Sequence, residues 1–124
     1  MRFMDHSNVI QLLEVYETTK YIHMLMPYLE GGELFKRIRQ KGLYKETVAI
    51  QIMKKFLSAL AYLHENMIVH RDLKPENLML AEKDDEIDIR IVDFGLSTRL
   101  SDPDEKLFLR CGSPGYVAPE LLRD

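Results

Sequence analysis

Apolar and polar positions in the first quarter of the chain form two short strand-like runs. Residues 9–17 and 21–26 are rich in apolar and β-branched side chains, and the polar residues 17–20 between them suit a turn. One proline and two glycines in residues 27–32 then interrupt the pattern. We therefore expect an antiparallel hairpin followed by an irregular connection.

Two helices are predicted next. Residues 33–41 begin with an acidic side chain, which the helix dipole favours, and Gly42 can end the helix. Its buried face is expected to comprise Leu34, Phe35 and Ile38. Residues 45–66 form the longest helical pattern, with apolar positions three and four residues apart. The predicted buried positions of this second helix are Val48, Ala49, Ile52, Met53, Phe56, Leu57, Leu60 and Ala61.

The second half of the chain contains two short apolar runs that predict strands. They cover residues 78–80 and 87–92, and the charged residues 82–86 between them suit a solvated hairpin tip. No repeat or low-complexity tract interrupts this part of the chain.

Length, charge and cysteine content limit the class of protein. The chain has 124 residues, which is enough for one small domain or part of a larger one. Lys and Arg total 17 against 20 Asp and Glu, and the net charge of -3 argues against a nucleic-acid partner. Cys111 has no partner for an internal disulfide, and no run is long enough for a signal peptide or a membrane span. We expect an intracellular, cytoplasmic protein, with the nucleus as the alternative.

Candidate chemistry is concentrated in the octapeptide HRDLKPEN and the tripeptide DFG. In the octapeptide, a carboxylate at Asp72 could accept a proton from a hydroxyl nucleophile, and Lys74 could neutralise charge on a phosphoryl group. Asn77 and Asp93 could supply the hard oxygen ligands that Mg²⁺ prefers. The residue types therefore suit phosphoryl transfer.

These two motifs, followed by Ala-Pro-Glu at 118–120, resemble the protein-kinase signature in its usual order. Lys74 within DLKPEN resembles the serine/threonine form of this loop, and Ser113 matches a hydroxyl that commonly bridges the catalytic Asp and Lys. The segments GGELF and CGSPGYVAPE look most like the calcium/calmodulin-dependent group. Taken alone, Ser113 would be read as opening a Pro-Gly turn.

The resemblance implies an α+β, protein-kinase-like fold of which the chain covers a part. Residues 1–26 would be the end of the small lobe, 27–32 the hinge, and 33–124 the start of the mainly helical large lobe. Residues 1–6 look like the last turn of the kinase C helix. Both ends look cut, and we expect further kinase segments on either side.

The resemblance also implies ATP and Mg²⁺ as cofactors and proteins with Ser or Thr acceptors as substrates. The implied catalytic residues are Asp72, Lys74, Asn77 and Ser113, and the implied metal ligands are Asn77 and Asp93. The implied binding residues are Met26, Pro27, Leu29, Glu33, Lys74, Glu76, Met79 and Asp93. Among these, Met26 would be the gatekeeper, Pro27 and Leu29 would offer backbone groups to the adenine, and Met79 would lie beneath it. Two matched apolar columns are implied, one comprising Leu34, Leu78, Met79 and Leu80 and the other Leu12, His70 and Phe94.

Glu33 and Glu76 match positions that meet arginines upstream of the acceptor in basophilic kinases, although both are also ordinary helix or loop residues. Arg71 matches a residue that grips an activation-loop phosphate, but the usual acceptor position is Leu109. One hypothesis is that carboxylates replace the phosphate, and the alternative is a solvated acidic loop. The carboxylates concerned are Asp102, Asp104 and Glu105.

No glycine-rich loop, strand lysine or C-helix glutamate is present in these residues. We therefore expect weak ATP binding and little catalysis by the segment alone. The leading hypothesis is part of an active serine/threonine kinase, regulated by calmodulin or another protein through regions outside this chain. The alternative is an impaired kinase remnant that acts as a protein-interaction module. Sequence upstream of Met1 encoding a glycine-rich loop and a Val-Ala-x-Lys would favour the first.

Overall fold

Three small sheets and two helices make up the regular structure of the computed structural model, which describes residues 4–123. The elements are β1 (Glu14–Glu17), β2 (Ile22–Leu25), β3 (Gly32–Glu33), α1 (Leu34–Lys41), α2 (Glu46–Glu65), β4 (Ile68–Val69), the 3-10 turn η1 (Pro75–Asn77), β5 (Leu78–Leu80), β6 (Ile89–Ile91), β7 (Thr98–Arg99) and the 3-10 turn η2 (Pro119–Leu121). Strands pair as β1-β2, β3-β5-β6 and β4-β7, all antiparallel. The fold is therefore α+β, as predicted.

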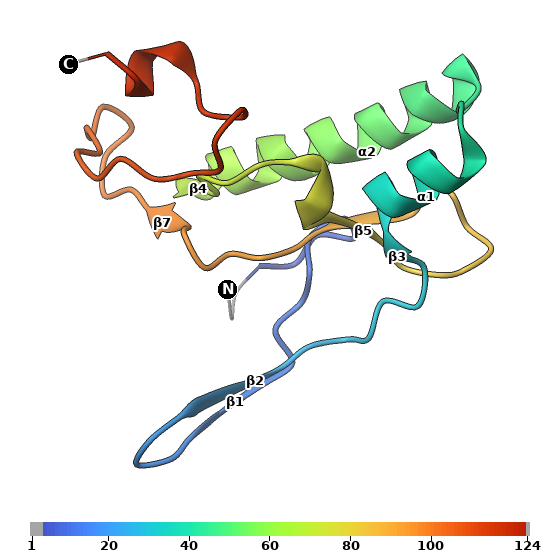
Figure 1. The fold of residues 1–124 in the computed structure, drawn as a ribbon. Coiled ribbons are helices and arrows are strands. Elements are labelled where there is room, and N and C mark those ends of the chain that lie inside the picture. Colours follow the sequence, from blue (N-terminus) through green and yellow to red (C-terminus); the bar gives the residue numbers. More distant parts are fainter. Residues whose placement is uncertain (1–3, 124) are drawn as a thin grey trace.

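The predicted hairpin is present, but its first strand is shorter than expected. β1 and β2 pair from Glu14 opposite Leu25 to Glu17 opposite Ile22, and Figure 1 shows them extending away from the rest of the fold. The backbone N–H of Thr18 donates to the Tyr21 carbonyl across the predicted turn. All eight strand residues are exposed, as expected for a hairpin with no further strand beside it.

The start of the predicted first strand pairs elsewhere. Val9 forms a parallel bridge with Ile91 of β6, and Ile10 donates its N–H to the Ile91 carbonyl at 2.9 Å. Val9 and Ile10 are each 4% exposed, whereas β1 is solvated. Burial of these two apolar side chains against β6 is worth about 1.5–3 kcal/mol each, which explains why the segment leaves the hairpin.

Both predicted helices form, with ends close to those expected. α2 runs between its caps at Lys45 and Asn66, and Gly42 ends α1 with a positive φ of 84° and an N–H bond to the Ile38 carbonyl. Glu33, the predicted first residue of α1, instead belongs to β3, where it pairs with Met79. Its extended backbone (φ -68°, ψ 128°) is that of an N-cap, so it precedes the helix.

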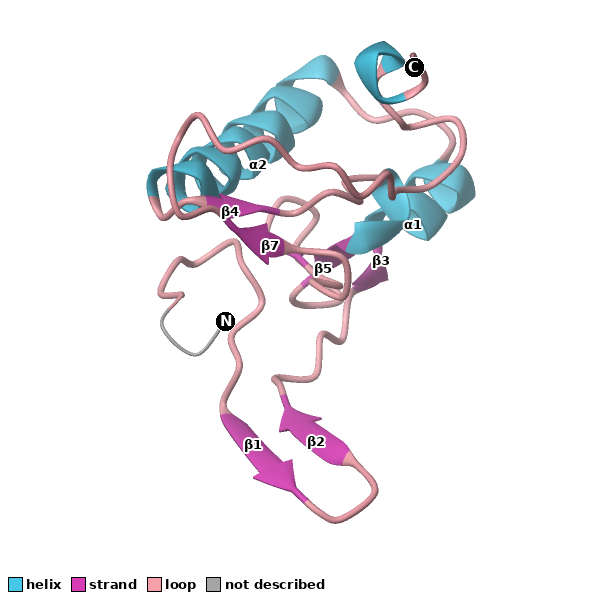
Figure 2. Ribbon diagram, turned by 90° about the vertical axis from the view of Figure 1, so that its left-hand side faces the viewer, coloured by secondary structure: helices cyan, strands magenta, loops and turns pink. Residues whose placement is uncertain are grey.

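The buried face of α2 is narrower than predicted. Figure 2 shows α2 lying along the small sheets, and its contacts are with β4 and β6. Its most buried residues are Ile52, Ala59 and Leu63. The prediction was wrong for four positions, Ala49, Met53, Leu57 and Ala61, which are exposed. The strands cover only one side of the helix in residues 4–123, and the predicted apolar stripe is wider than that side.

The predicted helical turn before the hairpin is not observed. Met1, Arg2 and Phe3 lie outside the described residues, and Asp5 and His6 are not helical. The Asn8 N–H donates to the imidazole Nδ1 of His6 at 3.0 Å, and the Val9 N–H donates to the His6 carbonyl. This side-chain-supported turn satisfies the local backbone without a helix.

The apolar core forms two clusters beneath the helices. One joins Met4, Val9, Ile10, Leu29, Ala59, Leu63, Ile91 and Phe94, and the other joins Leu34, Ile52, Leu80 and Ile89. Leu78 packs against both. None of the helices in the described part of the chain has the length and apolar character needed to cross a bilayer.

Candidate active site

The loop between β4 and β5 is held in place by a buried histidine. His70 is 1% exposed, and the Asp72 N–H donates to its Nδ1 at 3.2 Å. Because Nδ1 accepts, the ring proton lies on Nε2, which donates to the Val92 carbonyl at 2.9 Å. The imidazole also packs edge-on to Phe94, with centroids 4.8 Å apart. His70 thus fixes both the loop and the segment that follows β6.

Asp72 lies at the centre of a hydrogen-bond network. Lys74 Nζ donates to Asp72 Oδ2 at 2.9 Å and to Ser113 Oγ at 2.5 Å. The Asn77 side-chain amide donates to the Asp72 carbonyl at 2.9 Å and to Oδ2 at 3.3 Å. Oδ1 is buried and has no hydrogen-bond partner among residues 4–123. One carboxylate oxygen is therefore fixed, and the other can accept a hydrogen bond.

The network keeps both charges in place. The hydrogen bond from Lys74, with a smaller contribution from Ser113, lowers the pKa of Asp72. The same hydrogen bond to Asp72 raises the pKa of Lys74, and the carboxylates of Glu76 and Asp93 add to the effect. At neutral pH Asp72 is a carboxylate and Lys74 is an ammonium.

Asn77 and Asp93 lie on neighbouring backbone segments. The Val92 N–H donates to the Asn77 carbonyl at 3.0 Å, which extends the β5-β6 ladder to the residue before Asp93. The Asn77 amide nitrogen is turned to Asp72, which leaves its side-chain oxygen for a cation. Asp93 is exposed, and its Oδ1 accepts the Gly95 N–H at 3.3 Å.

The oxygen donors of Asn77 and Asp93 suit Mg²⁺, an ion that proteins bind with few of their own ligands. Within residues 4–123, no group of three or more His, Cys, Asp or Glu residues is placed to hold a metal ion by itself. Mg²⁺ typically takes one or two carboxylate or amide ligands and completes its shell with phosphates and water. Asn77 and Asp93 would hold such an ion together with a nucleotide.

Backbone strain marks the same region. Arg71 and Asp93 have positive φ angles of 67° and 60°, and they are two of the three non-glycine residues of this kind between residues 4 and 123. Such a conformation costs a non-glycine residue about 1–2 kcal/mol. Gly112 has a φ of 127°, and a Cβ there would lie 3.2 Å from the Arg71 carbonyl oxygen. The absence of a side chain at Gly112 therefore allows the segment that carries Ser113 to lie close to Arg71.

A cavity of about 580 Å³ lies beside Asp93. Five of the implied binding residues line it: Met26, Pro27, Leu29, Met79 and Asp93. The Leu29 N–H and the Pro27 carbonyl have no hydrogen-bond partner among the described residues, whereas the Leu29 carbonyl accepts the Gly32 N–H at 3.4 Å. The walls are mainly apolar, as for a flat aromatic ligand.

The remaining implied binding residues lie outside this cavity, around the loop between β4 and β5. Glu33 forms an ion pair with Lys36, and its strand β3 contacts η1, which carries Glu76. Glu76 Oε2 is buried with no hydrogen-bond partner in residues 4–123. Lys74 lies on the Asp72 network.

Sequence reasoning missed other residues of the cavity wall, among them Ile10, Met24 and Val92. Met24 had a usable signal, because alternation along a strand places it on the same side as Met26. Ile10 had none, since its position depends on the bridge to β6. Of the implied apolar column around Met79, Leu34 and Leu80 belong to the core cluster that contains Ile52. Met79 itself packs against the other cluster, which contains Phe94. His70 and Phe94 of the second column are in contact.

The structure does not support carboxylate pairing of Arg71. Its Nε donates to the Leu96 carbonyl at 2.6 Å, and no ion pair to the acidic loop forms among residues 4–123. Glu105 accepts the Ser101 N–H, and Asp102 accepts the Asp104 N–H. These local bonds favour the alternative of a solvated acidic loop.

Comparison with known proteins agrees with this geometry. The model of the protein kinase domain family matches residues 1–124. The chain belongs to the protein kinase family. The resemblance stated from the HRD, DFG and APE motifs is therefore confirmed.

Relatives of this kinase segment include serine/threonine kinases of the calcium/calmodulin-dependent type. It is 51% identical over 118 residues to a probable myosin light chain kinase of Dictyostelium discoideum, covering 95% of this chain and 37% of that protein. It is 48% identical over 120 residues to human calcium/calmodulin-dependent protein kinase type IV, covering 97% of this chain and 25% of that protein. A probable serine/threonine-protein kinase 2 of Plasmodium falciparum is 46% identical over 123 residues, and the match covers 99% of this chain and 24% of that protein. The chain thus spans about a quarter to somewhat over a third of the length of these relatives.

Proposed function

We propose that the protein containing this chain is a serine/threonine protein kinase that transfers the γ-phosphate of ATP to Ser or Thr residues of proteins. The observation that supports this best is the state of Asp72. Lys74 and Asn77 hold its Oδ2, while Oδ1 is buried and has no partner among the described residues. A carboxylate oxygen held in this way can accept the proton of a substrate hydroxyl.

Each residue of the network has a role in this proposal. Asp72 orients the acceptor hydroxyl and takes its proton, and its lowered pKa keeps it ionised at neutral pH. Lys74 balances negative charge beside the acceptor, and Ser113 fixes the Lys74 ammonium from the later segment. Asn77 and Asp93 would hold Mg²⁺. Bound Mg-ATP supplies the phosphoryl group, and positioning and charge neutralisation are the main tasks of the protein.

Substitution of Asp72 in the complete kinase domain tests the proposal. Asp72→Asn should lower kcat by roughly 10²–10⁴, the usual range for loss of a general base. The affinity for Mg-ATP should change little, because Asp72 does not line the nucleotide cavity. Asp102→Asn, in the exposed loop, is a matched control and should leave kcat unchanged. Turnover by Asp72→Asn within about threefold of the parent would refute the proposal.

We further propose that the substrate carries basic residues before the acceptor. The buried, unpartnered Oε2 of Glu76 supports this, since a buried carboxylate oxygen without a donor is costly and a substrate arginine would satisfy it. Glu33 lies on a strand that contacts the same turn. A peptide array comparing upstream Arg with Ala tests this preference. Glu76→Gln should reduce the discrimination about tenfold, and equal phosphorylation of both peptides by the parent protein would contradict it.

The isolated segment should bind nucleotide weakly. The cavity is lined by one hairpin strand, the hinge, β5 and the segment after β6, and the glycine-rich cover of kinases is not among these residues. We expect little thermal stabilisation of residues 1–124 by Mg-ATP at millimolar concentration, whereas ligand at about 100 times its Kd would add about 2.7 kcal/mol. A large stabilisation would show that the cavity alone suffices.

Control by calmodulin through segments outside these residues is also proposed, because the relatives include human calcium/calmodulin-dependent protein kinase type IV. Addition of calcium and calmodulin to the complete protein tests it. The alternative, an interaction module without catalysis, gains no support from a site in which Asp72, Lys74, Asn77 and Ser113 form one network.

A further inference from the structure

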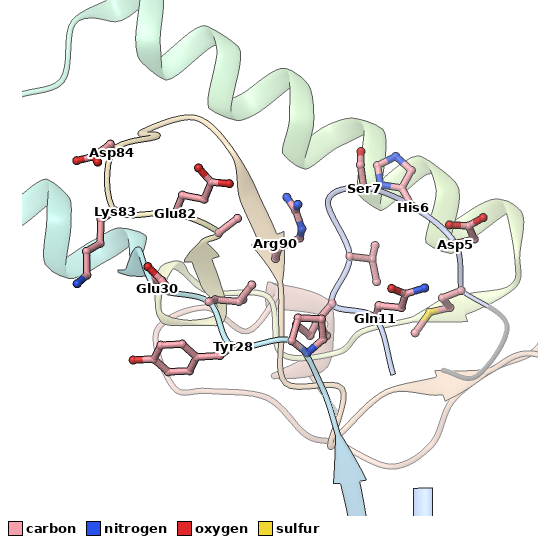
Figure 3. A pocket seen from close by; sticks show the side chains of 16 residues that line it. Asp5, His6, Ser7, Gln11, Tyr28, Glu30, Glu82, Lys83, Asp84 and Arg90 are labelled. Carbon is pink, nitrogen blue, oxygen red and sulfur yellow. The ribbon is translucent and has the colours of Figure 1, made fainter. Parts of the chain in front are cut away.

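A second, larger hollow lies beside the hinge and adjoins the nucleotide cavity, with which it shares Ile10, Pro27, Tyr28 and Leu29. Its volume is about 740 Å³, and three segments line it: residues 4–11, the hinge residues 27–30, and the β5-β6 turn with Arg90. Figure 3 shows the labelled side chains of these segments surrounding it. The roles proposed above for the catalytic network do not involve this hollow.

The walls of the hollow are held in position by hydrogen bonds. The Glu30 N–H donates to the Ala81 carbonyl at 3.0 Å, which ties the hinge to the β5-β6 turn. The Asp5 N–H donates to the Tyr62 hydroxyl at 2.7 Å, and the imidazole of His6 bonds to Ser58 Oγ at 3.2 Å. The hollow is therefore formed without a ligand, which lowers the entropic cost of binding.

The lining combines apolar side chains with an acidic rim. Met4, Val9, Ile10, Pro27, Leu29 and Ala81 supply the apolar part. Four carboxylates join them, from Asp5, Glu30, Glu82 and Asp84. The two lining cations are Lys83 and Arg90, and Arg90 is already paired with Asp88 at 2.7 Å.

The four lining carboxylates form no ion pair within residues 4–123. An excess of unpaired negative charge disfavours nucleotides, nucleic acids and anionic lipid headgroups. It favours cationic side chains, and the apolar lining favours an aliphatic one beside them. A volume of about 740 Å³ is within the roughly 300–1,000 Å³ of binding pockets. It has room for only a few side chains.

We propose that this hollow is a docking site for a short, extended segment of a partner protein that carries Arg or Lys residues and an intervening aliphatic residue. The carboxylates of Glu82, Asp84 and Glu30 take the cationic groups, and the aliphatic side chain lies on the apolar part near Leu29 and Ala81. The segment docks outside the catalytic network, so it can be a part of a substrate or regulator other than the phosphorylated residue.

Fluorescence anisotropy on the protein with its complete kinase domain tests the docking site. The probe is a fluorescein-labelled Arg-Leu-Arg-Leu-Arg peptide, which has no phosphate acceptor. The variant Glu82→Lys/Asp84→Lys should weaken binding at least tenfold, because it reverses two charges on the rim. Both side chains are exposed and accept no hydrogen bond among residues 4–123, so the fold should be retained. Asp102→Lys/Asp104→Lys makes the same change in net charge away from the hollow and should change the Kd less than twofold.

Three outcomes would overturn the docking site. Equal weakening by both double variants would show attraction by net charge alone. Equal binding of an Arg-Ala-Arg-Ala-Arg peptide would show that the apolar part is unused. Loss of binding in Glu76→Gln would place the peptide on the proposed substrate site. Activity of the rim variant on a short substrate peptide should equal that of the parent, which separates this inference from the proposed kinase function.

Discussion

His70 connects the stability of the fold to the position of the loop that carries Asp72, and its replacement by leucine gives a sharp prediction. Leucine retains apolar volume but removes both ring nitrogens. The Asp72 N–H, which is buried, and the Val92 carbonyl, which is partly buried, would then lose their partners. We expect His70→Leu to fold less stably and to catalyse more slowly.

The magnitude follows from the two contacts. Leaving a buried backbone group without a partner costs about 1–3 kcal/mol, and the partly buried Val92 carbonyl belongs at the lower end of that range. Loss of the edge-on contact with Phe94 adds about 0.5–1.5 kcal/mol. The sum is about 4 kcal/mol, or roughly 8–16 °C in Tm for a domain of 150–250 residues.

Urea unfolding of the complete kinase domain measures the first effect, and steady-state kinetics measures the second. His64→Leu is the matched control, because His64 is exposed on α2 and its side chain makes no hydrogen bond within the described residues. It should change stability by less than about 0.5 kcal/mol. Because a displacement of about 1 Å can cost 10²-fold in rate, kcat of His70→Leu should fall by about that factor. A loss below about 1 kcal/mol with unchanged kcat would refute the reasoning.

Three other contacts give further predictions. Lys74→Met should raise the pKa of Asp72 toward its usual value and move the acid limb of the kcat profile to higher pH, because the Lys74 bond is the main cause of the lowered pKa. Asp88→Asn should lower the free energy of unfolding by about 1 kcal/mol near pH 7. Because the pKa of Asp88 is lowered in the folded state, its carboxylate stabilises the fold at pH values above the pKa of the unfolded state. Urea unfolding should therefore show that the stability difference between variant and parent shrinks as the pH falls. Gly31→Ala should cost about 1–3 kcal/mol by thermal unfolding, because a Cβ would lie 2.4 Å from a carbonyl oxygen of the β5-β6 turn. Gly42→Ala, which has open space but a φ of 84°, should cost about 1 kcal/mol.

The Asp88 prediction depends on a link between α2 and β6. Burial alone would raise the pKa of Asp88, but hydrogen bonds from Arg90 at 2.7 Å and Lys55 at 3.2 Å outweigh it and lower the pKa. Lys55 belongs to α2, so this carboxylate joins the helix to the start of β6, the strand that precedes Asp93. Unchanged pH dependence in Asp88→Asn would show that solvent screens the pair fully.

Local structure was determined by the sequence itself. Both helices, the hairpin turn and strand β5 lie within a residue or two of their predicted positions, because hydrogen bonds within a helix or hairpin join residues close in the chain. The sequence also identified the kinase family, because the HRD, DFG and APE motifs occur together in a fixed order, which is more specific than any one of them.

Contacts between distant residues were decided only by the tertiary structure. Ser113 meets Lys74 across 39 residues of chain, Val9 leaves the hairpin for β6, and among residues 4–123 the strands cover one side of α2. The hollow proposed as a docking site brings together three segments that no local pattern relates. The pattern of apolar residues predicts where a strand or helix can form. Which other element that strand or helix packs against depends on how all the elements pack together.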